Sequence, residues 1–526
     1  MNKKNALLMA YHKEGIADFA KGLISHGYTI YGSRGTVKSL KEDGVPAHDI
    51  ADVVGAPILG HRVVSLSREI AAGLLSRDIP EDIVELEKNN IVWFDLAAID
   101  FYPLEEELQN PAHTKESVIE KTDIGGPTAV RAAAKGGRIV VTDPADRERV
   151  LLWLKNGRPN ESDFIDALAA KAEYLVARYV AASARGRGGD IYDAHLGEKT
   201  ASCKYGENAY QSPAALYSDK TDDPLALSRF LLHEGTPLSY NNWCDVERLL
   251  TTTTHIAAAY DRNFKKVPHI AVGVKHGNPC GAAVHEEEAK ALEHMMQGDP
   301  LSIFGGVIMA TFPITAALAD TLAGKMLDGI IAPSFEPEAI EKLRRKGDKC
   351  RFIENNALLT LTERSLDDSA RIRYVRGGYL REPNYSFVPD FGAPELIKHT
   401  TATKQEEEDM LLAASVGATS NSNTIALVKN GMLLGNGVGQ QDRVGAATLA
   451  LTRAKRAGHD TKGAVAYSDS FFPFPDGPEV LIDGGIRAIF TTSGSKNDQA
   501  TIDLCNGRGV ALYMIPDTLG RGFFGH

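Results

Sequence analysis

The chain has 526 residues, of which 43% are hydrophobic and 24% charged, and its formal net charge is −11. A domain usually has about 100–200 residues, so this length predicts two to four domains, and the composition excludes a wholly disordered chain. The acidic balance disfavours a function in nucleic-acid binding, because no general basic field would attract it.

The first part of the sequence predicts alternating strands and helices. Residues 6–11 form an apolar run of strand length, and apolar residues then recur at helical spacing over residues 16–24. Further strands are predicted at residues 28–31, 91–94 and 138–141, which implies parallel crossover units. A helix over residues 163–184 is followed by the Gly/Arg stretch 185–189, a candidate boundary. We therefore predict two domains, 1–195 and 196–526.

The second part again mixes strands with helices. A strand at 270–274 is expected to enter a Gly/Pro loop at 275–281, with an Ala/Glu-rich helix after it. Asn430-Gly431 between apolar runs 424–428 and 432–435 predicts a β-hairpin. A helix over 443–453 and strands at 486–491 and 510–515 complete the pattern.

The cysteines and the hydropathy of the sequence indicate the cellular compartment in which the chain is expected. The five cysteines are scattered without a Cys-x-x-Cys pair, which predicts no disulfide framework and no structural zinc. The apolar run 6–11 is too short for a secretion signal, and no window approaches the ~18 apolar residues of a membrane span. We therefore expect a cytoplasmic protein that does not enter a membrane.

Two motifs in the first part are candidates for anion binding. Ser33-Arg34-Gly35-Thr36 lies at a strand-to-helix turn, where backbone amides bind phosphate, although an ordinary helix cap explains it as well. Asp123-Ile-Gly-Gly126 offers a carboxylate beside an approachable backbone, and Arg131 and Lys135 share one face of the following helix. A tight turn with a solvated basic helix is the alternative.

In the second part, Lys275-His276-Gly-Asn-Pro-Cys-Gly281 places a proton carrier and a cation together at the end of a buried strand. The alternative to a functional site is that Lys275 is simply a surface charge at the end of the strand. A zinc deaminase would need a second thiolate after Pro-Cys, and Gly281-Ala-Ala283 does not supply it. Turn-rich residues 420–423 and 435–441 and the aromatic cluster at 468–474 also stand out; the aromatic cluster would suit a flat ligand.

The order of these motifs resembles one family across essentially the whole chain: the bifunctional purine biosynthesis family, which joins an IMP cyclohydrolase to an AICAR transformylase. The residues that carry the resemblance are 33–36, 123–126 with 131–135, 205–208, 275–281, 304–306, 328–333, 422–423, 429–431, 439–443, 469–474 and His526.

The resemblance implies an α/β fold, with an N-terminal methylglyoxal-synthase-like parallel-sheet domain followed by two cytidine-deaminase-like α/β subdomains without zinc. It also implies a homodimer with transformylase sites built across the interface. The formyl group of 10-formyltetrahydrofolate would move to AICAR, and formyl-AICAR would close to IMP with loss of water.

Site residues follow by resemblance. In the transformylase half, His276 would move the proton, Lys275 would stabilise the oxyanion and protonate the leaving nitrogen, and Asn423 would orient the reacting groups. Arg443 would face the folate. The nucleotide would contact Lys204, Tyr205, Asn242, Gly305, Asp328, Phe471, Asp476 and Arg521. In the cyclohydrolase half, Lys135 and Tyr102 would act on the reacting carbonyl, Asp123 on the carboxamide, and Lys13, Ser33, Arg34, Gly35 and Thr36 on the nucleotide.

The cyclohydrolase half departs from the family pattern. The family's Gly-Gly-Arg-Val-Lys-Thr-Leu-His-Pro reads Gly60-His-Arg-Val-Val-Ser-Leu-Ser-Arg68 here, so Val64 replaces a lysine. Our hypothesis is that the Arg34 guanidinium fills the space of that lysine. In the other half, Lys204 replaces an arginine and loses its bidentate fork.

Two alternatives stay open. One is a transformylase whose N-terminal domain is a nucleotide-binding or structural module, favoured by Val64. The other is a deaminase-like protein with a different activity or none, opposed by Lys275, His276 and Asn423. A potassium ion near the C-terminal loops is also open.

Overall fold

The computed structural model describes residues 4–59, 62–189, 191–219 and 221–525. The chain divides into two compact units, Met1–Leu196 and Gly197–His526, and each is described by itself. In the described ranges no helix has both the length and the apolar composition to cross a bilayer.

Unit 1 is built on a parallel sheet with the strand order β3-β2-β1-β4-β5. Its strands are β1 (Asn5–Met9), β2 (Thr29–Gly32), β3 (His48–Asp49), β4 (Leu96–Ile99) and β5 (Ile139–Val141). Its helices are α1 (Ile16–Ser25), α2 (Arg34–Glu42), α3 (Ala51–Val54), α4 (Arg68–Leu75), α5 (Pro80–Lys88), α6 (Leu104–Gln109), α7 (Lys115–Glu120), α8 (Gly125–Lys135), α9 (Asp146–Lys155) and α10 (Glu161–Gly188).

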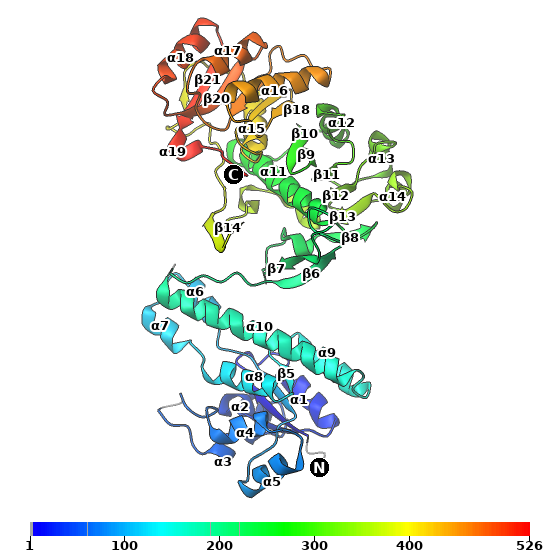
Figure 1. Cartoon of the computed structure of the whole chain (residues 1–526), viewed down its shortest axis with the longest axis vertical. Helices are drawn as coiled ribbons and strands as arrows, with labels where there is room; N and C mark the ends of the chain where they lie inside the picture. The colour runs from blue at the N-terminus through cyan, green and yellow to red at the C-terminus, as the bar shows by residue number, and fades with distance from the viewer. Residues whose placement is uncertain (1–3, 60–61, 190, 220, 526) are drawn as a thin grey trace. The chain divides into compact units, whose positions relative to one another are not determined.

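Helices cover both faces of this sheet, as the alternation along β1 requires. Ala6 and Leu8 pack against α1, α2 and α9, whereas Leu7 packs against α4, α8 and the long helix α10 (Figure 1). The strand order reverses between β1 and β4, and ligands of open parallel sheets bind at such a switch point.

One expectation for unit 1 is wrong. Residues 91–94 are not a strand; the fully buried Leu96–Ile99 is, and its two alanines made it inconspicuous beside the bulkier run before it. The candidate boundary at 185–189 lies a few residues before the division between the two units, because α10 continues to Gly188. A side chain at Gly186 would lie 2.7 Å from Leu108, so glycine here allows close helix packing.

Unit 2 contains, in its described residues, a mixed twelve-stranded sheet ordered β16-β21-β20-β19-β17-β18-β10-β9-β11-β12-β13-β8. Its strands are β8 (Leu231–Glu234), β9 (His269–Lys275), β10 (Asn278–His285), β11 (Val307–Ala310), β12 (Gly329–Ala332), β13 (Arg351–Glu354), β16 (Ile397–Lys398), β17 (Ile425–Lys429), β18 (Met432–Gly437), β19 (Val465–Ser468), β20 (Ala488–Ser493) and β21 (Ala511–Pro516). Two separate hairpins pair β6 (Glu198–Cys203) with β7 (Ala214–Ser218) and β14 (Ala370–Val375) with β15 (Gly378–Pro383).

The helices of unit 2 repeat with the strands. They are α11 (Tyr240–Phe264), α12 (Glu288–Gly298), α13 (Ala316–Leu322), α14 (Pro337–Leu343), α15 (Lys404–Gly417), α16 (Arg443–Arg456), α17 (Asp476–Asp483), α18 (Asp498–Gly507) and α19 (Asp517–Gly520), with 3-10 turns at Leu227–Arg229, Asn356–Thr360 and Glu363–Ser365. Each half runs helix, hairpin, helix and then alternating strands and helices. The two halves join where β10 pairs antiparallel with β18. The order of elements therefore reveals an internal duplication.

Burial follows the same duplication. Helices α11 and α15 cover one face of the long sheet, while α12–α14 and α16–α18 cover the other face of their own halves (Figure 1). Both halves thus present equivalent strand ends, and the antiparallel join at β10 and β18 places the start of β10 beside the end of β18.

The predicted Gly/Pro loop at 275–281 is instead a tight hairpin turn. His276 (φ 52°) and Gly277 (φ 68°) are both left-handed, like Asn430 (φ 52°) and Gly431 (φ 70°) in the predicted hairpin at 424–435, which is confirmed. Histidine tolerates this conformation better than most residues, so His-Gly acts here as Asn-Gly does.

Candidate functional site

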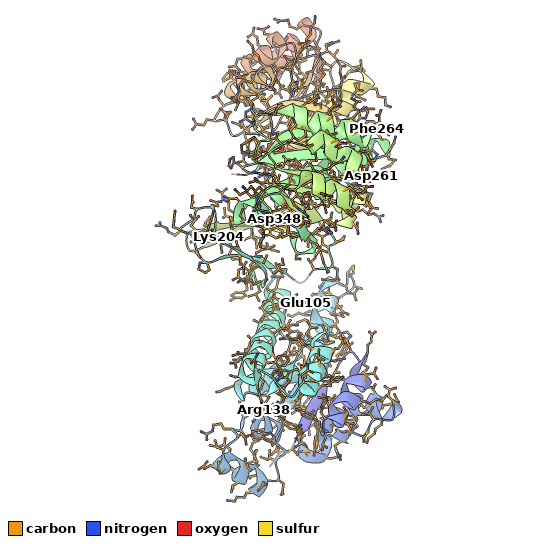
Figure 2. The ribbon with its side chains drawn as sticks, turned by 90° about the vertical axis from the view of Figure 1, so that its right-hand side faces the viewer. Glu105, Arg138, Lys204, Asp261, Phe264 and Asp348 are labelled. Atoms are coloured by element: carbon orange, nitrogen blue, oxygen red, sulfur yellow. The ribbon has the colours of Figure 1, made fainter. Side chains whose placement is uncertain are left out.

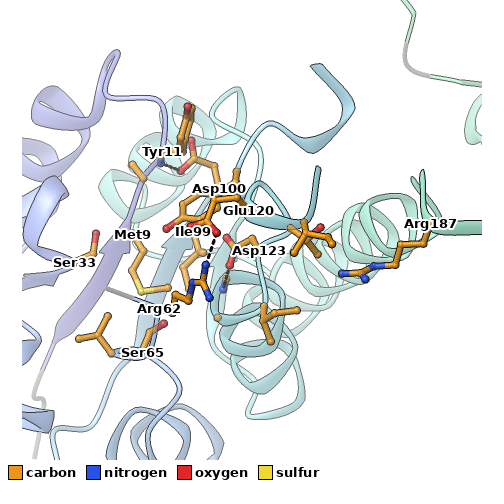
Figure 3. A pocket seen from close by; sticks show the side chains of 18 residues that line it. Met9, Tyr11, Ser33, Arg62, Ser65, Ile99, Asp100, Glu120, Asp123 and Arg187 are labelled. Carbon is orange, nitrogen blue, oxygen red and sulfur yellow. Dashed lines mark hydrogen bonds and ion pairs between the residues drawn. The ribbon is translucent and has the colours of Figure 1, made fainter. Parts of the chain in front are cut away.

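A cavity of about 380 Å³ opens at the switch point of the unit 1 sheet (Figure 3). Met9 and Tyr11 reach it from the end of β1, Asp100 and Tyr102 from the end of β4, and Asp123 to Gly126 from the start of α8. The Asp100 carboxylate accepts the backbone N–H groups of Tyr11 (2.6 Å) and His12 (3.0 Å), which fixes the two strand ends to each other.

Among the predicted nucleotide residues of unit 1, Ser33 lines this cavity directly. Thr36 is fully buried behind it, where its hydroxyl accepts the Ala10 N–H at 3.0 Å and meets Lys13 Nζ at 3.4 Å. Partial burial lowers the pKa of Lys13. Lys13 and Thr36 thus support the cavity wall, and Gly35 leaves open space where a side chain would stand.

The acidic side of the cavity is held by α8. Asp123 Oδ1 accepts the Gly126 N–H at 2.9 Å, and the Asp123 N–H donates to the Tyr179 hydroxyl at 2.7 Å. Burial raises the pKa of Asp123, and burial together with the nearby Asp123 charge raises the pKa of Tyr102. A protonatable carboxyl group and a neutral phenol therefore face the same space.

Two arginines line this cavity, Arg62 and Arg187, and the sequence reasoning named neither as a site residue. Arg62 lies beside Val64 in the lining and pairs with Glu120 at 2.7 Å (Figure 3). Arg34 is mostly exposed and lies 3.6 Å from Asp49 instead. The hypothesis required the Arg34 guanidinium to fill the space of the missing lysine. In this structure it does not. The motif residues Gly60 and His61 lie outside the described residues.

Lys135 does not line this cavity; together with Asp123, Ile124 and Arg131 it lines a neighbouring hollow of about 510 Å³. It is the last residue of α8, whose first residue, Gly125, lines the cavity; at about 1.5 Å per residue the two ends are roughly 15 Å apart. Arg131, on the same helix, pairs with Glu173 at 3.1 Å.

Several of the predicted transformylase residues of unit 2 lie at the ends of central strands, along one side of the long sheet. Lys275 ends β9, and Gly305 and Asp328 immediately precede the adjacent strands β11 and β12. Asn423 precedes β17, which pairs with β18. The Asn278 side chain links the two halves: its Oδ1 accepts the Asn421 N–H at 3.1 Å, and its Nδ2 donates to the His276 carbonyl at 3.3 Å.

Helix α11 holds the turn that carries His276 in place through a hydrogen bond. Asp245 is buried, and its carboxylate accepts the Gly277 N–H at 2.8 Å. Burial raises the pKa of Asp245, opposed by that hydrogen bond and by the His276 charge. Lys275 Nζ donates to the Phe304 carbonyl beside Gly305. The cation and the imidazole thus project from a rigid turn.

The Asn423 loop is organised by the buried Asp469. This carboxylate accepts from the Ser422 hydroxyl (2.6 Å) and the Thr424 N–H (3.0 Å) and pairs with Arg443 (3.1 Å). Asn423 itself donates both its backbone and side-chain N–H groups to the Gln440 carbonyl. The Arg443 side chain is 11% exposed, so most of its guanidinium is engaged inside the protein.

The other predicted nucleotide residues come from several elements of unit 2. Lys204, labelled in Figure 2, is exposed after β6 with the half-buried Tyr205 next to it. Asn242 accepts the Ser239 N–H and closes a capping box on α11, so its carbonyl oxygen is occupied. Arg345 lies 3.2 Å from Asp328. Phe471 and Asp476 follow β19, and Arg521 pairs with Asp517 after α19.

Neither unit, over the residues described, contains three or more His, Cys, Asp or Glu side chains grouped so as to hold a metal ion. Cys280 is half-buried in β10, and burial raises the pKa of its thiol to about 12, so it is not a thiolate near neutral pH.

Comparison with known proteins finds family models that match parts of both units. A model of the family described as "AICARFT/IMPCHase bienzyme" matches residues 133–453, and one described as "MGS-like domain" matches residues 15–128. The expected methylglyoxal-synthase-like domain at the N-terminus is thereby confirmed.

Whole-length relatives agree. The chain is 36% identical over 521 residues to "Bifunctional purine biosynthesis protein PurH" of Oceanobacillus iheyensis, covering 97% of this chain and 98% of that one. It is 34% identical to the protein of the same name from Natranaerobius thermophilus, covering 97% of each, and 36% identical to that from Anoxybacillus flavithermus, covering 97% and 98%.

Proposed function

The chain belongs to the AICARFT/IMPCHase bienzyme family, and from this premise we propose how its two units divide the two reactions. The protein is an AICAR formyltransferase that uses 10-formyltetrahydrofolate and an IMP cyclohydrolase, both in purine biosynthesis. Our proposal assigns ring closure to residues 1–195 and formyl transfer to residues 196–526.

In formyl transfer the chemical problem is a weak nucleophile, because the lone pair of the AICAR amine is conjugated with the carboxamide. His276 accepts the proton of that amine as it attacks the formyl carbon, and Lys275 stabilises the oxyanion and protonates the departing folate nitrogen. Asn423 orients the reacting groups. The hydrogen bond from Asn421 to Asn278 carries this proposal, since it joins the His276 turn to the Asn423 loop.

For the nucleotide we propose contacts on both halves of unit 2, from the residues predicted by the sequence. Lys204, Tyr205, Gly305 and Asp328 reach it from the first half and Phe471, Asp476 and Arg521 from the second. Asn242 contributes through the NH2 group of its side-chain amide, because the oxygen of that amide closes the helix cap. Arg443 meets the folate only with the small exposed part of its guanidinium.

In ring closure the carboxamide nitrogen attacks the formyl carbon and water leaves. Asp123 interacts with the carboxamide, Tyr102 with the reacting carbonyl, and Ser33 and Arg62 with the anionic groups of the nucleotide. The shared cavity and the raised pKa values of Asp123 and Tyr102 support these roles.

The proposal includes a homodimer. Lys135 does not line the cavity of Figure 3 in its own chain, although it shares a neighbouring hollow with Asp123, so its role in ring closure could be served from its own chain or from a second copy. Mixing Lys135→Ala chains with Asp123→Asn chains tests this: activity recovered in the mixture supports delivery across the interface, and equal failure of all species opposes it.

The function is tested by supplying AICAR and 10-formyltetrahydrofolate and following tetrahydrofolate and IMP separately. His276→Ala should abolish most tetrahydrofolate release while leaving ring closure of added formyl-AICAR intact. His285→Ala, at the other end of the same hairpin, is the matched control. Substantial turnover by His276→Ala would contradict the role of that histidine.

The second candidate function is a transformylase without cyclohydrolase activity, favoured by Val64 in the cavity wall. Tetrahydrofolate without IMP in the same assay would select it. We also propose a potassium ion near the C-terminal loops, which is tested by repeating the assay in potassium and in sodium salts. The proposed cytoplasmic location is tested by fractionation of the source cells.

A further inference from the structure

The ring of Phe524 lies between two arginine guanidiniums. The guanidinium carbons of Arg248, on α11, and Arg371, on β14, each lie 4.1 Å from the centre of this ring. Phe524 is 4% exposed and Arg248 is 8% exposed, so the stack is largely shielded from water. Three elements far apart in the sequence meet here: helix α11, the β14–β15 hairpin and the C-terminal segment that carries Phe524.

The same segment lies directly on the Asn423 loop. The Ser422 N–H donates to the Phe524 carbonyl at 3.1 Å, and the Gly522 N–H donates to the Asp469 carbonyl at 2.8 Å. A side chain at Gly525 would come within 2.3 Å of Asn421. This close backbone contact means that the position of Phe524 sets the position of Ser422, the residue before Asn423.

The stack is also connected to the loop through Arg248. Its guanidinium donates to the Thr419 carbonyl and lies 3.4 Å from Asn421 Oδ1, so one group spans the ring and the start of the loop. Burial lowers the pKa of Arg248, and repulsion by the charge of Arg371 lowers it further. The faces of an aromatic ring attract both cations and hold them at a fixed separation.

We propose that the Arg248–Phe524–Arg371 stack is a positioning device for formyl transfer, which holds the C-terminal segment against residues 421–423 and thereby sets the place of Asn423. The inference rests on the proposed function of unit 2. Phe524 is a positioning residue: it acts through the loop and does not touch the reacting atoms.

The test measures both activities of the whole chain. Phe524→Leu removes the ring faces and should lower kcat for tetrahydrofolate release by about 10–100-fold, the scale expected for a misplaced reacting group, with a smaller change in KM. Phe524→Tyr keeps the faces and should retain most of the rate. Ring closure of added formyl-AICAR, assigned to unit 1, should be unchanged in both, and a wild-type urea-unfolding transition would show that unit 2 is folded as well.

A second pair of variants tests the arginines without altering the tail. Arg371→Lys keeps the charge but loses the planar group and should lower the same kcat several-fold, whereas Arg373→Lys, two residues along the strand, should not. Wild-type kcat in both Phe524→Leu and Arg371→Lys would overturn the inference, as would a parallel loss of both activities in each. If His276→Ala also keeps full formyl transfer, the proposed function fails as well; if His276→Ala is inactive, only the inference fails.

Discussion

Asp245 and Asp409 occupy equivalent positions in the two halves of unit 2, at the same distance from the first residues of α11 and α15. Asp245 accepts the N–H of Gly277 (2.8 Å), and Asp409 accepts those of Asn430 (2.8 Å) and Gly431 (2.7 Å). Each buried carboxylate thus fixes the left-handed turn of its hairpin. The duplication gave one turn a histidine and the other an asparagine.

From this relationship we expect the side-chain oxygen of Asp245 that accepts the Gly277 N–H, rather than the charge of the carboxylate alone, to matter for formyl transfer. Asp245→Ala leaves the Gly277 N–H unpaired and frees the His276 turn, so kcat for tetrahydrofolate release should fall by about 100-fold. Asp245→Asn retains an acceptor and should keep much more of the rate. Equal rates in the Ala variant and the wild type would contradict this.

Asp409 makes the stability of the protein depend on pH. Burial raises its pKa to about 6, above the ~3.9 of an unfolded chain, so the folded state binds this proton more tightly. The ionisation of Asp409 therefore costs stability as the pH rises from about 4 to about 6, and adds no further cost above that range.

In Asp409→Asn this cost is absent. The free energy of unfolding of the variant relative to the wild type should therefore improve by up to about 3 kcal/mol between pH 4 and pH 7, as measured by urea unfolding at a series of pH values. Asp368→Asn, at an exposed position elsewhere in unit 2, is the control and should show no such trend.

Ring closure should depend on the ionisation of Asp123. Asp123→Asn should reduce IMP formation from formyl-AICAR by at least about 100-fold and leave tetrahydrofolate release unchanged. Because burial raises the pKa of Asp123, the acid limb of the ring-closure rate should lie above the range of an exposed aspartate. A rate profile without that limb would contradict the role.

Arg62, and not Arg34, should be the arginine that ring closure needs. Arg62→Ala removes the guanidinium from the cavity wall and should raise KM for formyl-AICAR, whereas Arg34→Ala alters a residue beside Asp49 and should leave ring closure close to the wild-type rate. A large loss in Arg34→Ala would restore the hypothesis drawn from the sequence.

Val64→Lys tests the departure from the family pattern in the opposite direction. Val64 lines the cavity, so a lysine there would place an ammonium group beside the bound nucleotide. We expect faster ring closure than in the wild type. Ser65→Lys, at the neighbouring lining position, is the control, and no gain in Val64→Lys would show that Arg62 already supplies the required charge.

Elements whose signals are local could be predicted from the sequence alone. The amphipathic spacing of residues 16–24 gave α1, and Asn430-Gly431 gave its hairpin, because each pattern acts between near neighbours in the chain. The order of motifs also determined the family and placed Lys275, His276 and Asn423 in the candidate site.

Which side chains meet depends on tertiary packing, and the local patterns of the sequence do not reveal it. Burial on both faces made Leu96–Ile99 a central strand, although its alanines carry a weak signal. Packing against Leu108 kept the Gly/Arg stretch helical, and Asp49 drew Arg34 away from the cavity that Arg62 enters. The Phe524 stack joins residues more than a hundred positions apart, so no local pattern could reveal it: such contacts depend on long-range packing, which neighbouring residues in the chain do not encode.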